Sequence, residues 1–197
     1  HRQDYDANSY WEATAYSRRH TDHYIFNRFA PNRAFIHETE VHSLGLSGKH
    51  ALTKAFALNY TAQYASDQIE STNLENSFTS REYYKVSLLP EYQFALNDLD
   101  TLTIRAGATY DDTNRNASEL SGLFDLTWQR VKQNGDSHTA YLSLSEASQV
   151  VGYTAIGGGT AGLFASDPDL DRESSKNLEL GYRITHMQWS FEAATFY

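Results

Sequence analysis

Histidine and carboxylate side chains lie close together at one place early in this 197-residue chain. His20 and His23 flank an aspartate, so the stretch offers two imidazoles and a carboxylate to a transition metal. A polar loop that contains His and Arg is more often simply solvated, because loops run over the surface. We therefore expect no metal here and keep both histidines as ligand contacts in a long loop.

Two other motifs resemble functional sequences but have the wrong spacing. His37 and His42 stand five residues apart, whereas the helix of a zinc protease needs four. Their segment has a strand pattern, which turns the two side chains to opposite faces. Gly157–Gly159 lacks the Lys-Ser/Thr that follows in a phosphate loop, so we interpret it as a flexible part of a loop.

A run of alternating aspartates resembles the start of a calcium loop. Asp167, Asp169 and Asp171 have the right spacing for its first three ligands. The positions of the required glycine and bidentate glutamate hold Arg172 and Leu178. An EF-hand is therefore excluded.

The composition excludes several classes of activity. The chain has no cysteine, which excludes disulfides, cysteine-ligated zinc and thiol catalysis. Serine and histidine are plentiful, but no Gly-x-Ser-x-Gly nucleophile elbow occurs. The net charge of -9 argues against non-specific binding to nucleic acid. We expect neither an enzyme, nor a cofactor, nor a nucleic-acid partner.

Period-two alternation is the strongest pattern in the chain, and it places successive side chains on opposite faces of a strand. Between Phe56 and Ala65, one face is aliphatic and aromatic while the other is small and polar. The pattern recurs at 84–94, 102–111, 122–129, 139–145, 177–184 and 188–193, and more weakly at 11–17 and 41–49. We count about nine strands, several near the 9–11 residues that a tilted membrane strand needs.

The connections between these strands alternate in length. Short turns are expected at 50–53, 97–100, 133–136 and 185–186, and longer polar segments at 19–36, 66–80, 112–118 and 149–175. This is the layout of an outer-membrane β-barrel, which has short turns at one end and long loops at the other. The mean hydropathy of -0.60 agrees with a barrel, whose apolar face is hidden in the alternation.

The aromatic residues form two expected rows at the ends of the strands. Such rows lie at the two membrane interfaces of a barrel. Toward the long loops lie Tyr64 and Tyr110, and toward the short turns Phe56, Phe94, Trp128 and Trp189.

Strand register provides a further test. If the turn at 97–100 is centred on Asp98, Glu91 faces Arg105 and Lys85 faces Asp111. Opposite charges that face each other across a strand pair are stabilising. The polar face would thus be held together by ion pairs.

Two positions fit this pattern less well. A two-residue loop at 185–186 would place Glu179 opposite Glu192, which is unfavourable unless a cation or partner intervenes. Pro90 cannot donate in a central ladder, so we expect a bulge there.

A set of short phrases lies between residues 141 and 183. They are Tyr141, Ser143 and Ser145, then Asp167-Pro168-Asp169-Leu170, then Glu173-Ser174, then Asn177-Leu178-Glu179-Leu180-Gly181-Tyr182. This order resembles TonB-dependent receptors, in which such a strand leads into a long extracellular loop and the next strand. The match covers about a fifth of the chain.

The resemblance implies a barrel of about 22 strands that is closed by an amino-terminal plug. Such receptors take up a scarce nutrient, for example a ferric siderophore or cobalamin, with energy delivered through TonB. We expect residues 1–197 to be part of one barrel domain in the bacterial outer membrane, as an internal fragment, because about nine strands leave the barrel open. The expected partners are membrane lipid, a small-molecule metal chelate or similar ligand, and the plug and TonB through parts outside this chain.

Two groups of candidate contact residues follow. Charged residues on the polar strand faces are expected to face the lumen, where they dock a plug, guide a ligand or simply pair: Lys85, Glu91, Arg105, Asp125, Glu179 and Arg183. Loop residues expected to contact a ligand are His20, His23, Tyr24, Tyr110, Asp111 and Tyr153. Two alternatives stay open: a smaller outer-membrane barrel (a passive channel or a hydrolase) and a soluble β-rich carbohydrate-binding module.

Overall fold

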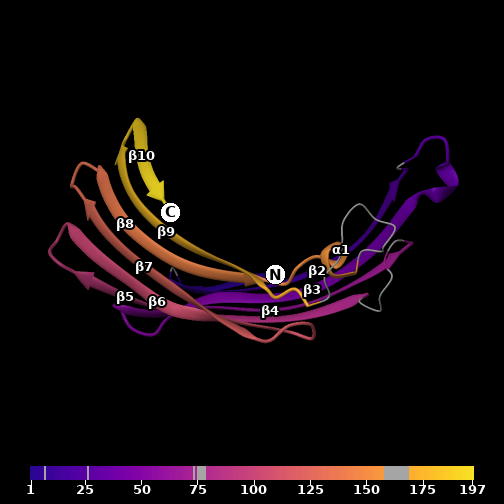
Figure 1. Ribbon diagram of the computed structural model, residues 1–197. Helices are drawn as coiled ribbons and strands as arrows, with labels where there is room; N and C mark the ends of the chain where they lie inside the picture. Colours follow the sequence, from indigo (N-terminus) through magenta and orange to yellow (C-terminus); the bar gives the residue numbers. More distant parts are fainter. Residues whose placement is uncertain (7, 26, 73, 75–78, 158–168) are drawn as a thin grey trace.

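The chain forms one antiparallel sheet that is bent into a trough (Figure 1). The structure, a computed structural model, describes residues 1–6, 8–25, 27–72, 74, 79–157 and 169–197. The sheet has ten strands in sequence order: β1 Arg2–Asp6, β2 Ser9–Tyr24, β3 Phe35–Ala51, β4 Phe56–Ser71, β5 Ser80–Ala95, β6 Asp100–Thr113, β7 Glu119–Val131, β8 Ser137–Gln149, β9 Glu173–His186 and β10 Trp189–Phe196. The strand beyond the predicted nine is β1, which is only five residues long.

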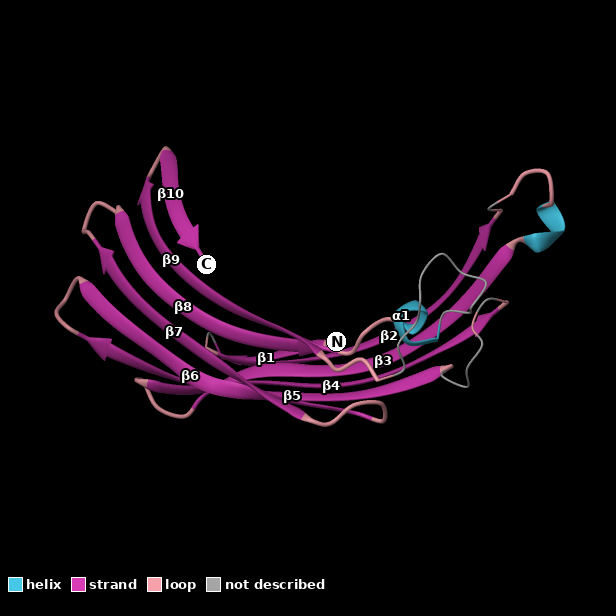
Figure 2. Ribbon diagram, viewed as in Figure 1, coloured by secondary structure: helices cyan, strands magenta, loops and turns pink. Residues whose placement is uncertain are grey.

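Helices are minor elements of this fold. A 3-10 turn, η1, spans Pro31–Arg33, and a short helix, α1, spans Tyr153–Gly157 (Figure 2). In the part of the chain that the structure describes, neither has the length and apolar character needed to cross a membrane.

The two faces of the sheet differ in chemistry as the alternation predicts. α1 lies within the trough (Figure 2), and its Tyr153 hydroxyl donates to the backbone carbonyl of Asp67 at 3.1 Å and to its carboxylate. Asp67 therefore points to the concave side. The register then assigns to this concave face the odd-numbered residues of β3 to β9 and the even-numbered residues of β2 and β10.

The convex face carries the large apolar side chains, and they are exposed. Examples from five strands are Leu44, Val86, Tyr110, Leu144 and Phe191, each between 44% and 60% exposed. A single sheet cannot bury both faces against itself, so this surface needs an apolar environment from outside.

The connections confirm the alternation of short and long segments at three of the four expected loops, although most boundaries shift. The turns join strands across 52–55, 96–99, 132–136 and 187–188, and longer connections fall at 25–34, 72–79 and 150–172. The fourth expected loop, at 114–118, is no longer than the turn at 132–136, so that expectation is wrong. β2 and β4 each run six residues into segments that were expected to be loops, as far as Tyr24 and Ser71. Polar residues continue the ladder there because the backbone hydrogen bonds of a strand do not depend on side-chain polarity.

Register is as expected in one hairpin and wrong in another. Glu91 faces Arg105, as predicted for the turn around Asp98. The last hairpin turns two residues later than predicted, with His186 opposite Trp189. Arg183 consequently faces Glu192 and binds it at 2.8 Å, which replaces the unfavourable contact between two glutamates.

Pro90 does not create the expected bulge. The β5–β6 register is the same on both sides of it, at Leu88–Ala108 and at Glu91–Arg105, but no pairing joins the positions between. Opposite this gap, a Cβ on Gly107 would overlap the carbonyl oxygen of Leu88. The ladder therefore accommodates a proline, which lacks an N–H, by close approach of the backbone at a glycine.

We predict that Gly107→Ala destabilises the sheet by about 1–3 kcal/mol, because the added methyl group meets backbone that cannot rotate away. The measurement is the urea midpoint for unfolding of the intact protein. Gly122→Ala is the matched control, since its Cβ would meet only the flexible Glu146 side chain at 3.6 Å. Equal midpoints for the two variants would contradict the close approach of the Leu88 backbone to Gly107.

Candidate functional site on the concave face

A cluster of charged residues lies on the concave face toward the long-loop end. Arg81 and Asp67 are directly opposed in β5 and β4 and form a bidentate ion pair, with N–O distances of 3.0 and 2.6 Å. The guanidinium of Arg81 also donates to the carbonyl of Val151 at 3.0 Å and lies 4.1 Å from the ring centre of Tyr153. A single arginine thus joins two strands to the start of the β8–β9 connection.

Asp111 is the centre of the neighbouring part of this cluster. Its carboxylate lies 2.9 Å from the Lys85 ammonium and 2.7 Å from the Arg172 guanidinium. Arg172 also donates to the carbonyl of Ala117 at 2.8 Å and to the Ser148 hydroxyl at 3.3 Å. Buried carboxylates of this kind are stable only when cations and donors surround them.

A pocket of about 410 Å³ lies between these residues and the β8–β9 connection. Its lining is mostly polar and carries both charges. The lining residues are Gln63, Ala65, Arg81, Tyr83, Lys85, Asp111, Ser148, Gln149, Val150 and Gly152.

Tyr153 acts as a neutral donor in this site. Burial raises the pKa of its phenol above the usual value, and the hydrogen bond to the Asp67 carboxylate raises it further. Because the pKa of the phenol is raised, the hydroxyl keeps the proton that it donates at neutral pH.

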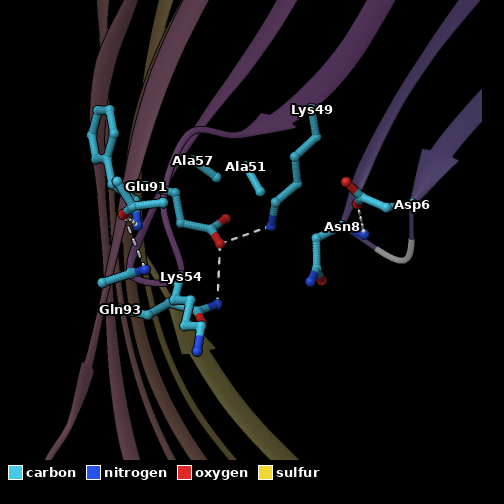
Figure 3. Close-up of a pocket in the computed structure, with 11 residues that line it drawn as sticks. Asp6, Asn8, Lys49, Ala51, Lys54, Ala57, Glu91 and Gln93 are labelled. Carbon is cyan, nitrogen blue, oxygen red and sulfur yellow. Dashed lines mark hydrogen bonds and ion pairs between the residues drawn. The ribbon is translucent and has the colours of Figure 1, made fainter.

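A second cluster lies on the same face toward the short turns (Figure 3). Glu91 is almost fully buried and lies 2.8 Å from both Lys49 and Arg105. Gln93 and Asn59 donate to the same carboxylate at 3.2 and 3.4 Å. Beside it is a pocket of about 350 Å³, which Lys49, Lys54 and Asp6 help to line. One carboxylate therefore connects four neighbouring strands.

The charged residues expected to face the lumen all lie on the concave face. Lys85, Glu91 and Arg183 have the ion-pair partners described above. Asp125 is opposite Arg105 in the register, and Glu179 accepts a hydrogen bond from Tyr141 at 2.7 Å.

The residues expected in loops are distributed differently. His20, His23 and Tyr24 belong to β2, so their assignment to a loop is wrong. His20 lies on the concave face and His23 on the convex face, because the two are three residues apart in a strand. They cannot bind one metal together.

Tyr110 and Asp111 are likewise strand residues, in β6, and point to opposite faces. Tyr110 lies on the convex face and is 46% exposed. Of the loop candidates, the structure brings together Asp111 and Tyr153, through the cluster around Arg81 and Arg172.

The described histidine and carboxylate side chains form no metal site. No three His, Asp or Glu side chains gather closely enough to hold an ion in the residues that the structure describes. Asp167, Gly158 and Gly159 lie outside those residues.

Sequence reasoning missed Asp67, Arg81 and Arg172. Asp67 lies in the segment 66–80 that was expected to be a loop, and Arg81 directly follows that segment, before the strand expected at 84–94. A long connection gives no turn from which to calculate a register. Arg172 was weighed only as a misfit in a calcium loop. The alternation gave no signal there, because Ser66, Gln68 and Glu70 continue the face that is apolar from Phe56 to Tyr64.

The chain matches, over residues 1–197, the family described as TonB dependent receptor-like, beta-barrel. It belongs to this family. The comparisons with curated proteins and with solved structures found no match. The family is one of outer-membrane transporters, which agrees with an antiparallel sheet from a larger barrel and with the expectation that the chain is not an enzyme.

We predict that Glu91→Gln destabilises the barrel by about 1–3 kcal/mol, because Lys49 and Arg105 then face each other without the carboxylate between them. The readout is the urea midpoint of the intact receptor. Lys176→Gln is the control, since its ion pair with Glu146 is exposed and its loss should leave the midpoint unchanged. A Glu91→Gln midpoint equal to that of the control would show that the charge of Glu91 contributes nothing to the stability of the barrel.

Proposed function

We propose that residues 1–197 form part of the barrel wall of a TonB-dependent receptor that takes up a scarce nutrient across the bacterial outer membrane. The nutrient is a metal chelate such as a ferric siderophore, or cobalamin. The observation that carries the proposal is the contrast between the two faces, apolar on the convex side and ion-paired on the concave side. The family supports the same assignment.

The convex face has the dimensions of a lipid-facing band. Tyr64 and Tyr84 pack together toward the long loops, with ring centres 5.1 Å apart, and Phe56 and Tyr92 toward the short turns, 6.4 Å apart. From Phe56 to Tyr64 the strand rises about 20 Å along the barrel axis, at ~3.4 Å per residue and a tilt of about 40°. This is close to the ~25 Å apolar band of outer-membrane barrels.

Beyond the outer aromatic row the convex face becomes charged. Arg19 forms an ion pair with Glu38, and Gln68 donates to Glu40 at 3.0 Å. Such side chains favour water over lipid, so we infer that the upper parts of β2, β3 and β4 project beyond the membrane.

The concave face suits a wet lumen that receives a plug. The clusters around Glu91 and Asp111 pair their charges within the wall and leave pockets beside them. We propose that the pocket near Glu91 faces a plug domain, which none of the described residues forms, and that the pocket near Asp111 faces the ligand. Coupling to TonB is then a property of the plug.

We predict that deletion of the receptor gene abolishes high-affinity uptake of one labelled metal chelate or cobalamin in the source bacterium. Uptake by the wild type should also stop when TonB is deleted or the proton gradient is dissipated, because the energy comes from the inner membrane. Uptake that depends on this gene but persists without TonB would contradict the receptor function and favour a passive channel.

A further inference from the structure

A short segment reaches over part of the concave face, from β8 to β5 and β4. The segment, residues 150–153, is called the strap here. It follows β8 and reaches β4 and β5, so that it spans the positions of β7 and β6 in the sheet. Its contacts join residues that are 70 and 86 positions apart in the chain.

The strap is held by buried groups at both of its ends. Val150, Val151 and Tyr153 are at most 7% exposed. Tyr153 donates to Asp67, and the carbonyl of Val151 accepts from Arg81. At the start of the strap, Ser148 is held by Arg172 from the far end of the same connection.

The pocket of about 410 Å³ lies under the strap. Val150 and Gly152 line it on one side, and the wall residues Gln63 and Lys85 line it on the other. Gln63 and Lys85 are paired four residues nearer to the short turns than the Asp67–Arg81 pair that holds Tyr153. The strap therefore lies on the long-loop side of the pocket, across the route from outside.

Arg81 belongs to both the pocket and the strap. Its guanidinium lines the pocket and also donates to Val151. A ligand in the pocket with a carboxylate, catecholate or carbonyl oxygen can accept the same N–H that now holds the strap. Binding of the ligand and release of the strap are then linked, because the ligand has a different affinity for the states with the strap held and released.

We propose that the strap is a latch, closed by Tyr153–Asp67 and Arg81–Val151, which must open before a ligand enters or leaves the pocket beneath it. The proposal rests on the proposed uptake function. It adds a specific moving part, which two polar contacts and the buried side chains of Val150 and Val151 hold closed.

Cross-linking in the intact receptor tests whether the latch must open. The chain has no cysteine, so Asp67→Cys with Tyr153→Cys adds the only two thiols in this segment, which a short reducible bis-methanethiosulfonate can bridge. Uptake should fall at least about 10-fold when the pair is bridged and recover on reduction. The matched control is Ser87→Cys with Thr109→Cys, which face each other on the same concave face and should tolerate the bridge. Equal uptake by the two bridged pairs overturns the latch while leaving the receptor function intact.

A labelling experiment tests the latch without any ligand. Gln63→Cys places a thiol in the pocket, and a bulky membrane-impermeant maleimide reports its accessibility. Adding Tyr153→Phe removes one hydrogen bond to a charged group and should raise the labelling rate about 10-fold. Labelling at Thr21→Cys, on the exposed part of β2, should not change. An unchanged rate at residue 63 overturns the latch, whereas absence of TonB-dependent uptake in the wild type counts against the proposed function instead.

Discussion

Every strand of this sheet pairs with the next strand in sequence, and the rest of the structure depends on that ladder. In hydrocarbon, an N–H or C=O without a partner costs several kcal/mol, so a membrane wall has to be built from continuous hydrogen-bonded neighbours. The ladder also fixes which side chains share a face, because the side-chain period of a strand is two. The apolar convex surface and the ion-paired concave surface are therefore consequences of a single register.

The ion pairs on the concave face stabilise this register against a slip of one residue. Glu91 connects four strands, and Asp111 connects β5 and β6 to the residue that leads into β9. Each carboxylate is buried among cations, so a slip of one residue would leave it facing the apolar side without a partner. The pairing of Arg183 with Glu192 has the same role in the last hairpin.

Much of the strand ladder could be predicted from the sequence, but little of the candidate site could. Alternation and short turns predicted the β5–β6 register to the residue, because a tight turn leaves few alternatives. Long connections carry no such constraint, so the extension of β2 to Tyr24 and the contacts of Asp67 with Tyr153 were not predicted. The hairpin at Met187 was misplaced by two residues because neither of its residues has a strong turn preference. Contacts over 86 positions follow from the folded trough and not from any local pattern.

The strap also affects the order in which the wall forms. Each strand pairs with the next strand in sequence, so the sheet can grow one strand at a time. Tyr153 finds Asp67 only after β4 to β8 are in place, since the trough itself brings the two together. Kinetically, the strap is a late, non-local contact, and its docking marks the completion of the five-strand segment over which it lies.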